Sequence, residues 1–182
     1  MGDSLITVVA IILAAVLMFI FPLMSISDRT DDISQLSVQT ATNDFVNEVA
    51  QTGLLEGSEY DAFLQTLTAT GNSFDVEMEL KVLDENPGKK VTQASADKIG
   101  ENVYYSKYTS QLLDEMYYPA GHSKEGESKK MPLKEGDQFA ITVKNTNTTI
   151  AQTLRNFFYR VTGNDTANIA ARHSAVVTVN GK

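Results

Sequence analysis

The sequence predicts an α+β protein in which a long hydrophobic N-terminal helix leads into a small head with an antiparallel β-sheet and packed helices. An uncharged apolar run over residues 5–24 is followed by apolar residues at helical spacing. Further along, apolar and polar residues alternate in segments typical of half-buried strands. We therefore expect an N-terminal helix over 1–52, apolar at 5–24 and amphipathic at 31–51, and a head over 53–182.

The apolar run has the length of a membrane-spanning helix. No charged residue lies between Leu5 and Met24, and about 20 residues at 1.5 Å each span roughly 30 Å, the thickness of a bilayer core. A signal peptide has a basic start, a shorter apolar centre and a small-residue cleavage site. Here Asp3 is acidic, no Lys or Arg precedes the run, and no Ala-x-Ala precedes Asp28. We therefore expect a retained membrane helix.

Composition limits the partners of the chain. Its 182 residues suit one domain with an appendage, and its formal net charge is −8. An acidic exposed portion argues against binding nucleic acid or anionic membranes through charge. Because there is no cysteine, the fold must be held by its core and its assembly. The positive-inside rule has almost nothing to count, and we place the acidic head outside because nothing basic holds it inside.

A second helical pattern follows the apolar run and joins it in one long helix. Gly53 is the expected end of this helix. Pro22 then lies inside the helix as a kink, since lipid-buried helices tolerate proline more readily than helices in water. The apolar residues of the second pattern are Ile33, Leu36, Ala41, Phe45, Val46 and Val49.

The first half of the head combines a short helix with an alternating strand. Ser58 resembles an N-cap, and apolar residues at helical spacing continue from it toward Gly71. Apolar and charged residues then alternate over 74–82, which predicts a half-buried strand. The Asn-Pro-Gly sequence at 86–88 ends this strand in a turn, and we place a partner strand at 90–93.

The second half of the head has more varied patterns. Spacing over 99–116 favours a helix, although the tyrosine-rich first half of this segment also fits a strand. The polar, glycine-bearing segment 119–136 predicts an exposed loop. Residues 139–143 alternate as a second strand, and helical spacing resumes over 150–161 before a turn. A last strand is expected over 175–181.

This order of elements resembles the type IV pilin superfamily, in which an apolar half-helix, an amphipathic continuation and a small antiparallel head follow one another. Pilins often carry a proline in the apolar half, where Pro22 stands. The head is also similar to TadE-like proteins of tight-adherence pilus systems and to single-pass proteins of Gram-positive conjugative elements. The segments that carry this similarity are "NDFVNEVAQTGLLEGSEYDAFLQTL", "FDVEMEL" and "LKEGDQFAITV".

The resemblance implies a structural pilin-like subunit of a bacterial surface filament, with apolar helices packed in the filament core. It implies self-association through these helices, residence in the membrane before assembly, and contacts with other pilus-machine proteins. The alternative is a single-pass accessory protein of a pilus-assembly or conjugation machine, such as a minor pilin. The chain would accordingly be found in a surface filament, or in the cytoplasmic membrane with its head outside.

The candidate assembly residues lie in the apolar half. In pilins a peptidase cuts after a glycine that precedes the apolar run, and a Glu at the fifth mature position matches the new N-terminal amine of a neighbour. Here Gly2 is the candidate glycine, Leu5 holds the fifth position, and Asp3 is the nearby acid. Alanines allow helices to approach closely, and proline lets a helix bend. We expect assembly to depend on Asp3, Ala10, Ala14 and Pro22.

No sequence signature of a catalytic, cofactor or metal site is present, so we expect no enzyme activity, no cofactor and no metal. His122 and His173 have no metal-ligand spacing, and Glu77 and Glu79 are interpreted as the solvated face of a strand. The tyrosines between 104 and 118 fit two interpretations. One is a packed helix face with its hydroxyls at the rim, and the other is a contact between subunits.

Overall fold

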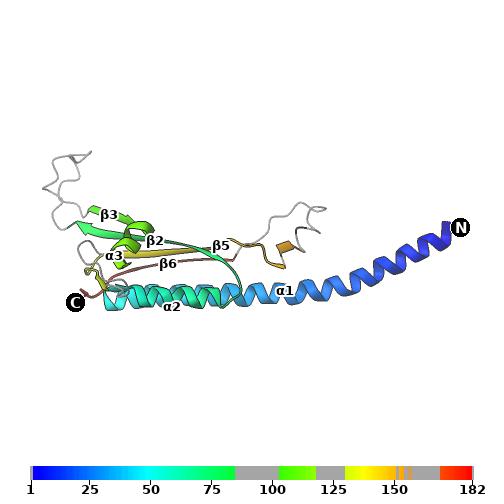
Figure 1. Cartoon of the computed structure of the whole chain (residues 1–182), viewed down its shortest axis with the longest axis horizontal. Helices are drawn as coiled ribbons and strands as arrows, with labels where there is room; N and C mark the ends of the chain where they lie inside the picture. Colours follow the sequence, from blue (N-terminus) through cyan, green and yellow to red (C-terminus); the bar gives the residue numbers. More distant parts are fainter. Residues whose placement is uncertain are drawn as a thin grey trace.

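The computed structural model shows a long helix with a small head packed along its second half (Figure 1). It describes residues 2–84, 103–117, 130–150, 152–153, 156 and 169–181. The helix, α1, covers Gly2–Thr52 and contains Pro22. The expected α+β class and the single helix running through Pro22 are therefore confirmed. The first half of α1 projects beyond the head and curves gently along its length (Figure 1).

The head contains two antiparallel sheets. The larger has the strand order β3-β2-β5-β6, and in the smaller β1 pairs with β4. The register of the two central strands places Met78 opposite Ile141 and Leu80 opposite Phe139. In chain order the head elements are β1 (Leu54–Glu56), α2 (Gly57–Thr68), β2 (Phe74–Asp84), β3 (Val103–Tyr108), α3 (Thr109–Tyr117), β4 (Lys130–Pro132), β5 (Gln138–Asn145) and β6 (Ala170–Val176).

The core lies between one face of α1 and one face of the larger sheet. Side chains in a strand alternate between the two faces of the sheet, so every second residue of β2 and β5 can face the helix. The ring of Phe45 on α1 stacks on Phe63 of α2 at 4.9 Å and meets Phe139 of β5 edge-on at 6.1 Å. Burying one large apolar side chain contributes about 1.5–3 kcal/mol. The apolar residues that α1, β2 and β5 supply to this core cluster are Val38, Phe45, Val46, Val49, Met78, Leu80, Phe139, Ile141 and Val143.

The strands predicted at 74–82 and 139–143 are confirmed as β2 and β5. Residues 103–108 form β3 and pair with β2, so over these residues the strand alternative for the segment 99–116 is confirmed and the helix is wrong, while residues 99–102 lie outside the described residues. Tyrosine favours strands when a partner strand is available, and here Tyr104 and Tyr108 pair with residues of β2 that lie 21 and 29 positions earlier in the chain. The helical part begins only at Thr109.

Three further assignments need correction. The exposed loop expected over 119–136 contains β4, with Met131 and Leu133 buried. The last strand occupies Ala170–Val176 rather than 175–181. Ser58 does not cap α2, since this helix begins at Gly57, and its N-cap, Glu56, makes no side-chain capping bond.

Several expected features lie outside the described residues. These are the turns at 86–88 and 163–165 and the partner strand at 90–93. Most of the helix expected over 150–161 also falls there, although residues 150, 152–153 and 156 are helical.

The end of α1 is tied to the C-terminal segment of the chain. Gly53 has a positive φ of 66°, and its N–H donates to the Val49 carbonyl at 2.9 Å, which ends the helix as expected. The Gly53 carbonyl accepts the Leu133 N–H at 2.8 Å, and the Thr178 N–H donates to the Ala50 carbonyl at 2.9 Å. The last turn of α1 is therefore held by backbone from two distant parts of the head.

The Gly136-Asp137 sequence before β5 connects two further parts of the head by hydrogen bonds. Asp137 is 2% exposed, and its two carboxylate oxygens accept the N–H groups of Leu83 and Lys134, each at 2.9 Å. Its backbone carbonyl accepts the Val177 N–H at 2.8 Å. Gly136 supplies the positive φ of 93° that the turn requires. One buried carboxylate thus joins the end of β2 to the turn that starts β5.

We expect Gly53→Ala to lower the free energy of unfolding by about 3 kcal/mol or more. A Cβ there would overlap the Val179 carbonyl oxygen, in addition to straining the positive φ. Gly71→Ala is the matched control, because Gly71 has a φ of 80° but open space around the added Cβ, so it should cost only about 1–2 kcal/mol. Urea unfolding of the parent and the two variants in detergent micelles measures the loss of unfolding free energy. Equal losses in Gly53→Ala and Gly71→Ala would contradict the prediction.

Acidic side chains gather at the start of α2. Burial raises the pKa of Glu59, and the carboxylates of Glu48 and Glu56 raise it further, while the Lys130 ammonium opposes them. The Lys130 Nζ lies 2.8 Å from a carboxylate oxygen of Glu56, and this ion pair raises the pKa of Lys130. One carboxylate oxygen of Glu59 is buried without a hydrogen-bond partner. Ionised Glu59 is therefore unfavourable in the folded state.

We expect Glu59→Gln to raise the Tm at neutral pH. Because the folded state raises the pKa of Glu59, the parent loses stability as the pH rises above the ordinary value of 4.5. The gain should therefore disappear below about pH 4.5, where this carboxyl is protonated in both states. Thermal unfolding of the parent and the variant at neutral pH and below about pH 4.5 tests this prediction, with Asp114→Asn on the exposed surface of α3 as the control. A pH-independent difference would show that ionisation of Glu59 is not the cause.

Candidate functional site: the apolar half of the long helix

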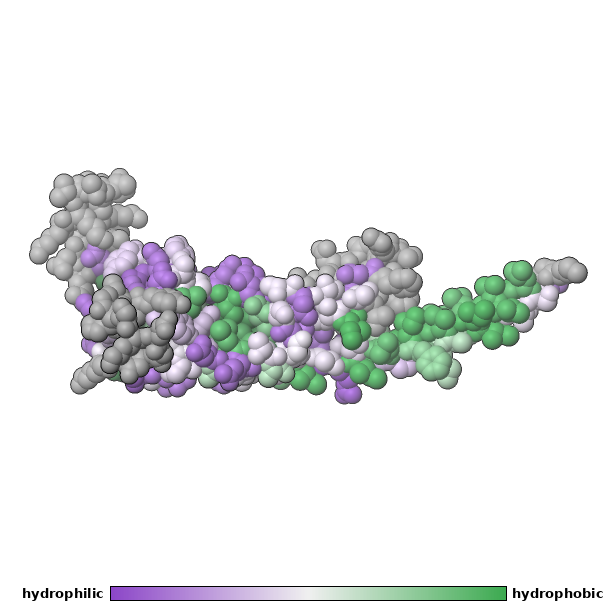
Figure 2. Space-filling view, in the orientation of Figure 1, coloured by the Kyte–Doolittle hydropathy of each residue, from purple (hydrophilic) through white to green (hydrophobic). Residues whose placement is uncertain are grey.

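The first half of α1 is an uncovered apolar surface. Figure 2 shows hydrophobic residues along the part of the helix that projects from the head. The helix is long and apolar enough to cross a membrane, and none of its most apolar stretch is buried. Soluble monomers rarely expose an apolar surface of this extent, so the segment is consistent with membrane anchoring. The large exposed side chains between residues 5 and 24 are Leu5, Ile6, Val8, Val9, Ile11, Ile12, Leu13, Val16, Met18, Phe19, Phe21 and Leu23.

The apolar half ends at a charged turn, and contacts with the head begin in the same turn. The acidic and basic residues of 28–32 come directly after the apolar segment. Asp31 accepts a hydrogen bond from the Thr149 hydroxyl at 2.8 Å. One turn later, the Gln35 amide donates to the Ala170 carbonyl at 2.6 Å and accepts the Ala170 N–H at 2.9 Å. These contacts fix the head to α1 immediately beyond the segment that fits a membrane.

The expected assembly residues fall on two faces of the helix. At about 100° of rotation per residue, Asp3, Ala10 and Ala14 lie within about 40° of one another. Pro22 lies about 80° around the helix from Ala14. All four are exposed. Because Pro22 has no N–H, the carbonyl of Met18 has no donor at the fourth following residue. The structure brings three of the four residues together, and their role in assembly stays a prediction.

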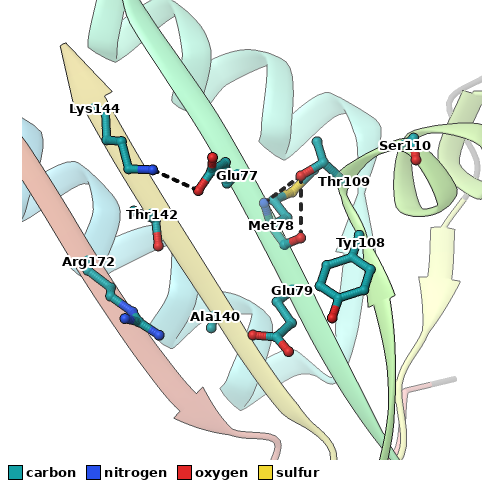
Figure 3. A pocket seen from close by; sticks show the side chains of 10 residues that line it. All are labelled: Glu77, Met78, Glu79, Tyr108, Thr109, Ser110, Ala140, Thr142, Lys144 and Arg172. Atoms are coloured by element: carbon teal, nitrogen blue, oxygen red, sulfur yellow. Dashed lines mark hydrogen bonds and ion pairs between the residues drawn. The ribbon is translucent and has the colours of Figure 1, made fainter.

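A shallow groove of about 670 Å³ lies on the solvent face of the larger sheet (Figure 3). In it the Lys144 Nζ lies 3.0 Å from a carboxylate oxygen of Glu77, and Thr109 hydrogen-bonds to the backbone of Met78. Glu79 accepts the Ser106 hydroxyl at 2.9 Å. The groove is therefore a solvated strand face with cross-strand pairs. Within the described ranges, no group of three His, Asp or Glu side chains could hold a metal ion.

The tyrosine segment and the two histidines have separate environments. Tyr104 and Tyr108 are 37% and 59% exposed on the edge strand β3, so the packed helix face expected for them is wrong. Tyr117, on α3, does pack, with its hydroxyl donating to Asp61 at 2.7 Å; burial and this bond raise its pKa. The Nε2 of His173 lies 3.3 Å from the Oδ1 of Asn47 on α1. His122 lies outside the described residues.

No protein-family model, curated protein or solved structure matches the chain. The class of protein is therefore defined by its architecture. A long apolar N-terminal helix carries a small head with antiparallel sheets, which is a pilin-like shape.

We expect Asp3→Ala to reduce self-association and leave the head folded. Asp3 lies in the first turn of α1, where an acid interacts favourably with the helix N-terminus and can pair with an amine of a neighbouring chain. Asp3→Glu keeps the charge and is the matched control. Chemical crosslinking in native membranes measures association, and circular dichroism of the purified chain measures folding. Unchanged association in Asp3→Ala would show that no such charge pairing operates.

Proposed function

We propose that this chain is a structural, pilin-like subunit of a bacterial surface filament of the type IV or Tad-like kind. The observation that carries the proposal is the uncovered apolar half of α1, which continues without interruption into the core of the head. An anchor needs only length and apolar character, whereas this helix also presents small side chains along one face. The resemblance to type IV pilins and TadE-like proteins supports the same role, which needs no catalytic site.

In this proposal the helix has two successive surroundings. Before assembly, lipid covers residues 5–24 and the head lies outside the cytoplasmic membrane. In the filament, copies of the same helix replace the lipid. Lipid tails are as apolar as the helix itself, so close packing rather than the hydrophobic effect must favour helix association. Ala10 and Ala14 permit such packing. A neighbouring helix can also donate a hydrogen bond to the Met18 carbonyl, which cannot receive one from Pro22. Other pilus-machine proteins would be the remaining partners.

One observation favours a second candidate. The segment before the apolar run carries Asp3 but not the Glu that pilins place near the start of the run. A single-pass accessory protein of a pilus-assembly or conjugation machine would not need that Glu, because it would stay in the cytoplasmic membrane. Both candidates share the anchored helix and differ in whether copies of it pack together.

Replacing residues 5–24 by an equally long poly-Leu segment should preserve membrane insertion and abolish assembly. A leucine helix keeps the apolar length and removes the shape that packing requires. Ala14→Leu and Pro22→Leu should each weaken assembly to a smaller degree, and Val9→Leu, on another face, is the control. Membrane fractionation measures insertion, and electron microscopy of material sheared from cells measures filaments. If the poly-Leu chain assembles like the parent, the segment is only an anchor and the accessory role is favoured.

A further inference from the structure

Three apolar residues of α1 stay uncovered beyond the apolar half. Ile26, Ile33 and Leu36 are 63%, 67% and 65% exposed. On a regular helix they lie within about 80° of one another, on the side opposite to the face with Val38 and Phe45. We call these three residues the outer stripe. The sequence pattern grouped Ile33 and Leu36 with the buried face, and the structure shows that they point away from it.

Neither the head nor lipid covers the whole of the outer stripe. Counted from Met24, the last residue of the apolar run, Ile33 lies about 14 Å and Leu36 about 18 Å along the helix. The headgroup layer on one side of a bilayer is only about 5–8 Å thick. The charged turn at 28–32 also lies between them and the apolar run. Lipid can therefore cover Ile26 but not Leu36.

The spacing of the outer stripe indicates another helix as its partner. Its members are separated by seven and then three residues, the positions a, a and d of a heptad repeat. Extending the repeat toward the N-terminus continues the seam into the apolar half, and extending it toward the C-terminus reaches Thr40. Two copies anchored in one membrane present this seam to each other in parallel. The residues at a are Ile12, Phe19, Ile26, Ile33 and Thr40, and those at d are Ala15, Pro22, Arg29 and Leu36.

The charges beside the stripe complement those of a second copy. A hollow of about 460 Å³ opens on this side of α1 and is lined by Ile26, Arg29, Thr30, Asp32 and Ile33. The side chains of Arg29 and Asp32 have no hydrogen bond or ion pair with the described part of the chain. In a parallel pair, Arg29 of one helix and Asp32 of the other lie within one helical turn. A guanidinium and a carboxylate at that separation can form a charge-assisted hydrogen bond.

We propose that the outer stripe, with Arg29 and Asp32, is a parallel helix–helix interface with a second copy of this chain, continuing the membrane contact to Leu36. This interface rests on the proposed function, since it requires that α1 helices associate. It adds to that association a second face of the helix, separate from the one with Ala10 and Ala14, together with a parallel orientation and a charged pair. Its last two apolar members, Ile33 and Leu36, lie on the water side of the charged turn, where the head leaves α1 open.

Cysteine crosslinking tests the interface directly, because the chain has no cysteine of its own. In the full chain in native membranes, Ile33→Cys and Leu36→Cys should give disulfide-linked dimers on mild oxidation. Ala41→Cys is the matched control and should not crosslink. Ala41 is partly exposed at a similar height, about 100° around the helix from the centre of the outer stripe and on the side away from Asp32. Crosslinking at Ala41 equal to that at both stripe positions would overturn the assigned face.

Charge reversal tests the ionic pair. In the Leu36→Cys background, Arg29→Asp and Asp32→Arg should each lower the dimer yield by about threefold or more, and the double variant should restore it. Failure of the double variant to restore the yield would overturn the pairing of Arg29 with Asp32.

The remaining outcomes distinguish this interface from a stripe covered by lipid and from filaments held by a different helix face. If Ile33→Cys and Leu36→Cys do not crosslink although the chain still forms filaments, the interface is wrong and the proposed function stands. If no self-association of any kind is found, the interface and the proposed function are both wrong.

In bilayer discs that hold one copy, Cys at position 36 should react with a water-soluble maleimide, and in discs with several copies it should be protected. Protection in both kinds of disc would assign the stripe to lipid and overturn the interface.

Discussion

The packing of one face of α1 under the larger sheet is the interaction on which the rest of the structure depends. Val38, Phe45, Val46 and Val49 are at most 4% exposed, so the second half of the helix is part of the core of the head. Gly53 ends the helix where strands and the C-terminal segment converge. Because α1 is a single helix, fixing residues 34–50 in the head also fixes the direction in which residues 5–24 project.

This continuity allows one helix to have two roles. Its second half uses one face for the core of the head, held in place by Thr149 on Asp31 and by Ala170 on Gln35. Its first half leaves every face open, which fits a segment surrounded first by lipid and then, in our proposal, by copies of itself. The outer stripe lies between these regions, on the face that the head does not use. The position of the head therefore determines which helix faces remain available for association.

The sequence predicts this protein well wherever a pattern is local and long. The apolar run, the alternation in β2 and β5, and Gly53 as the helix end are of that kind. It left β3 open between helix and strand, missed β4, and began the last strand five residues too late, because these short strands form through pairing with distant segments. Met131 and Leu133 are buried by such pairing inside a stretch whose composition is that of a loop. The candidate assembly residues Asp3, Ala10, Ala14 and Pro22 came from the pilin resemblance and from the residues of the apolar run, and their role stays a prediction. The outer stripe was not predicted, since helical spacing alone does not show which of two apolar faces the head covers.

The division of α1 between head and assembly is tested most directly by the behaviour of a chain that begins at residue 29. It lacks the apolar half and retains every α1 residue of the buried face. Sedimentation equilibrium and urea unfolding should show a soluble monomer that unfolds cooperatively, while the full chain associates in membranes. Only two turns of the outer stripe remain in this chain, too few to hold a helix pair by themselves. A truncated chain that is unfolded, or that still forms stable oligomers, would contradict this division.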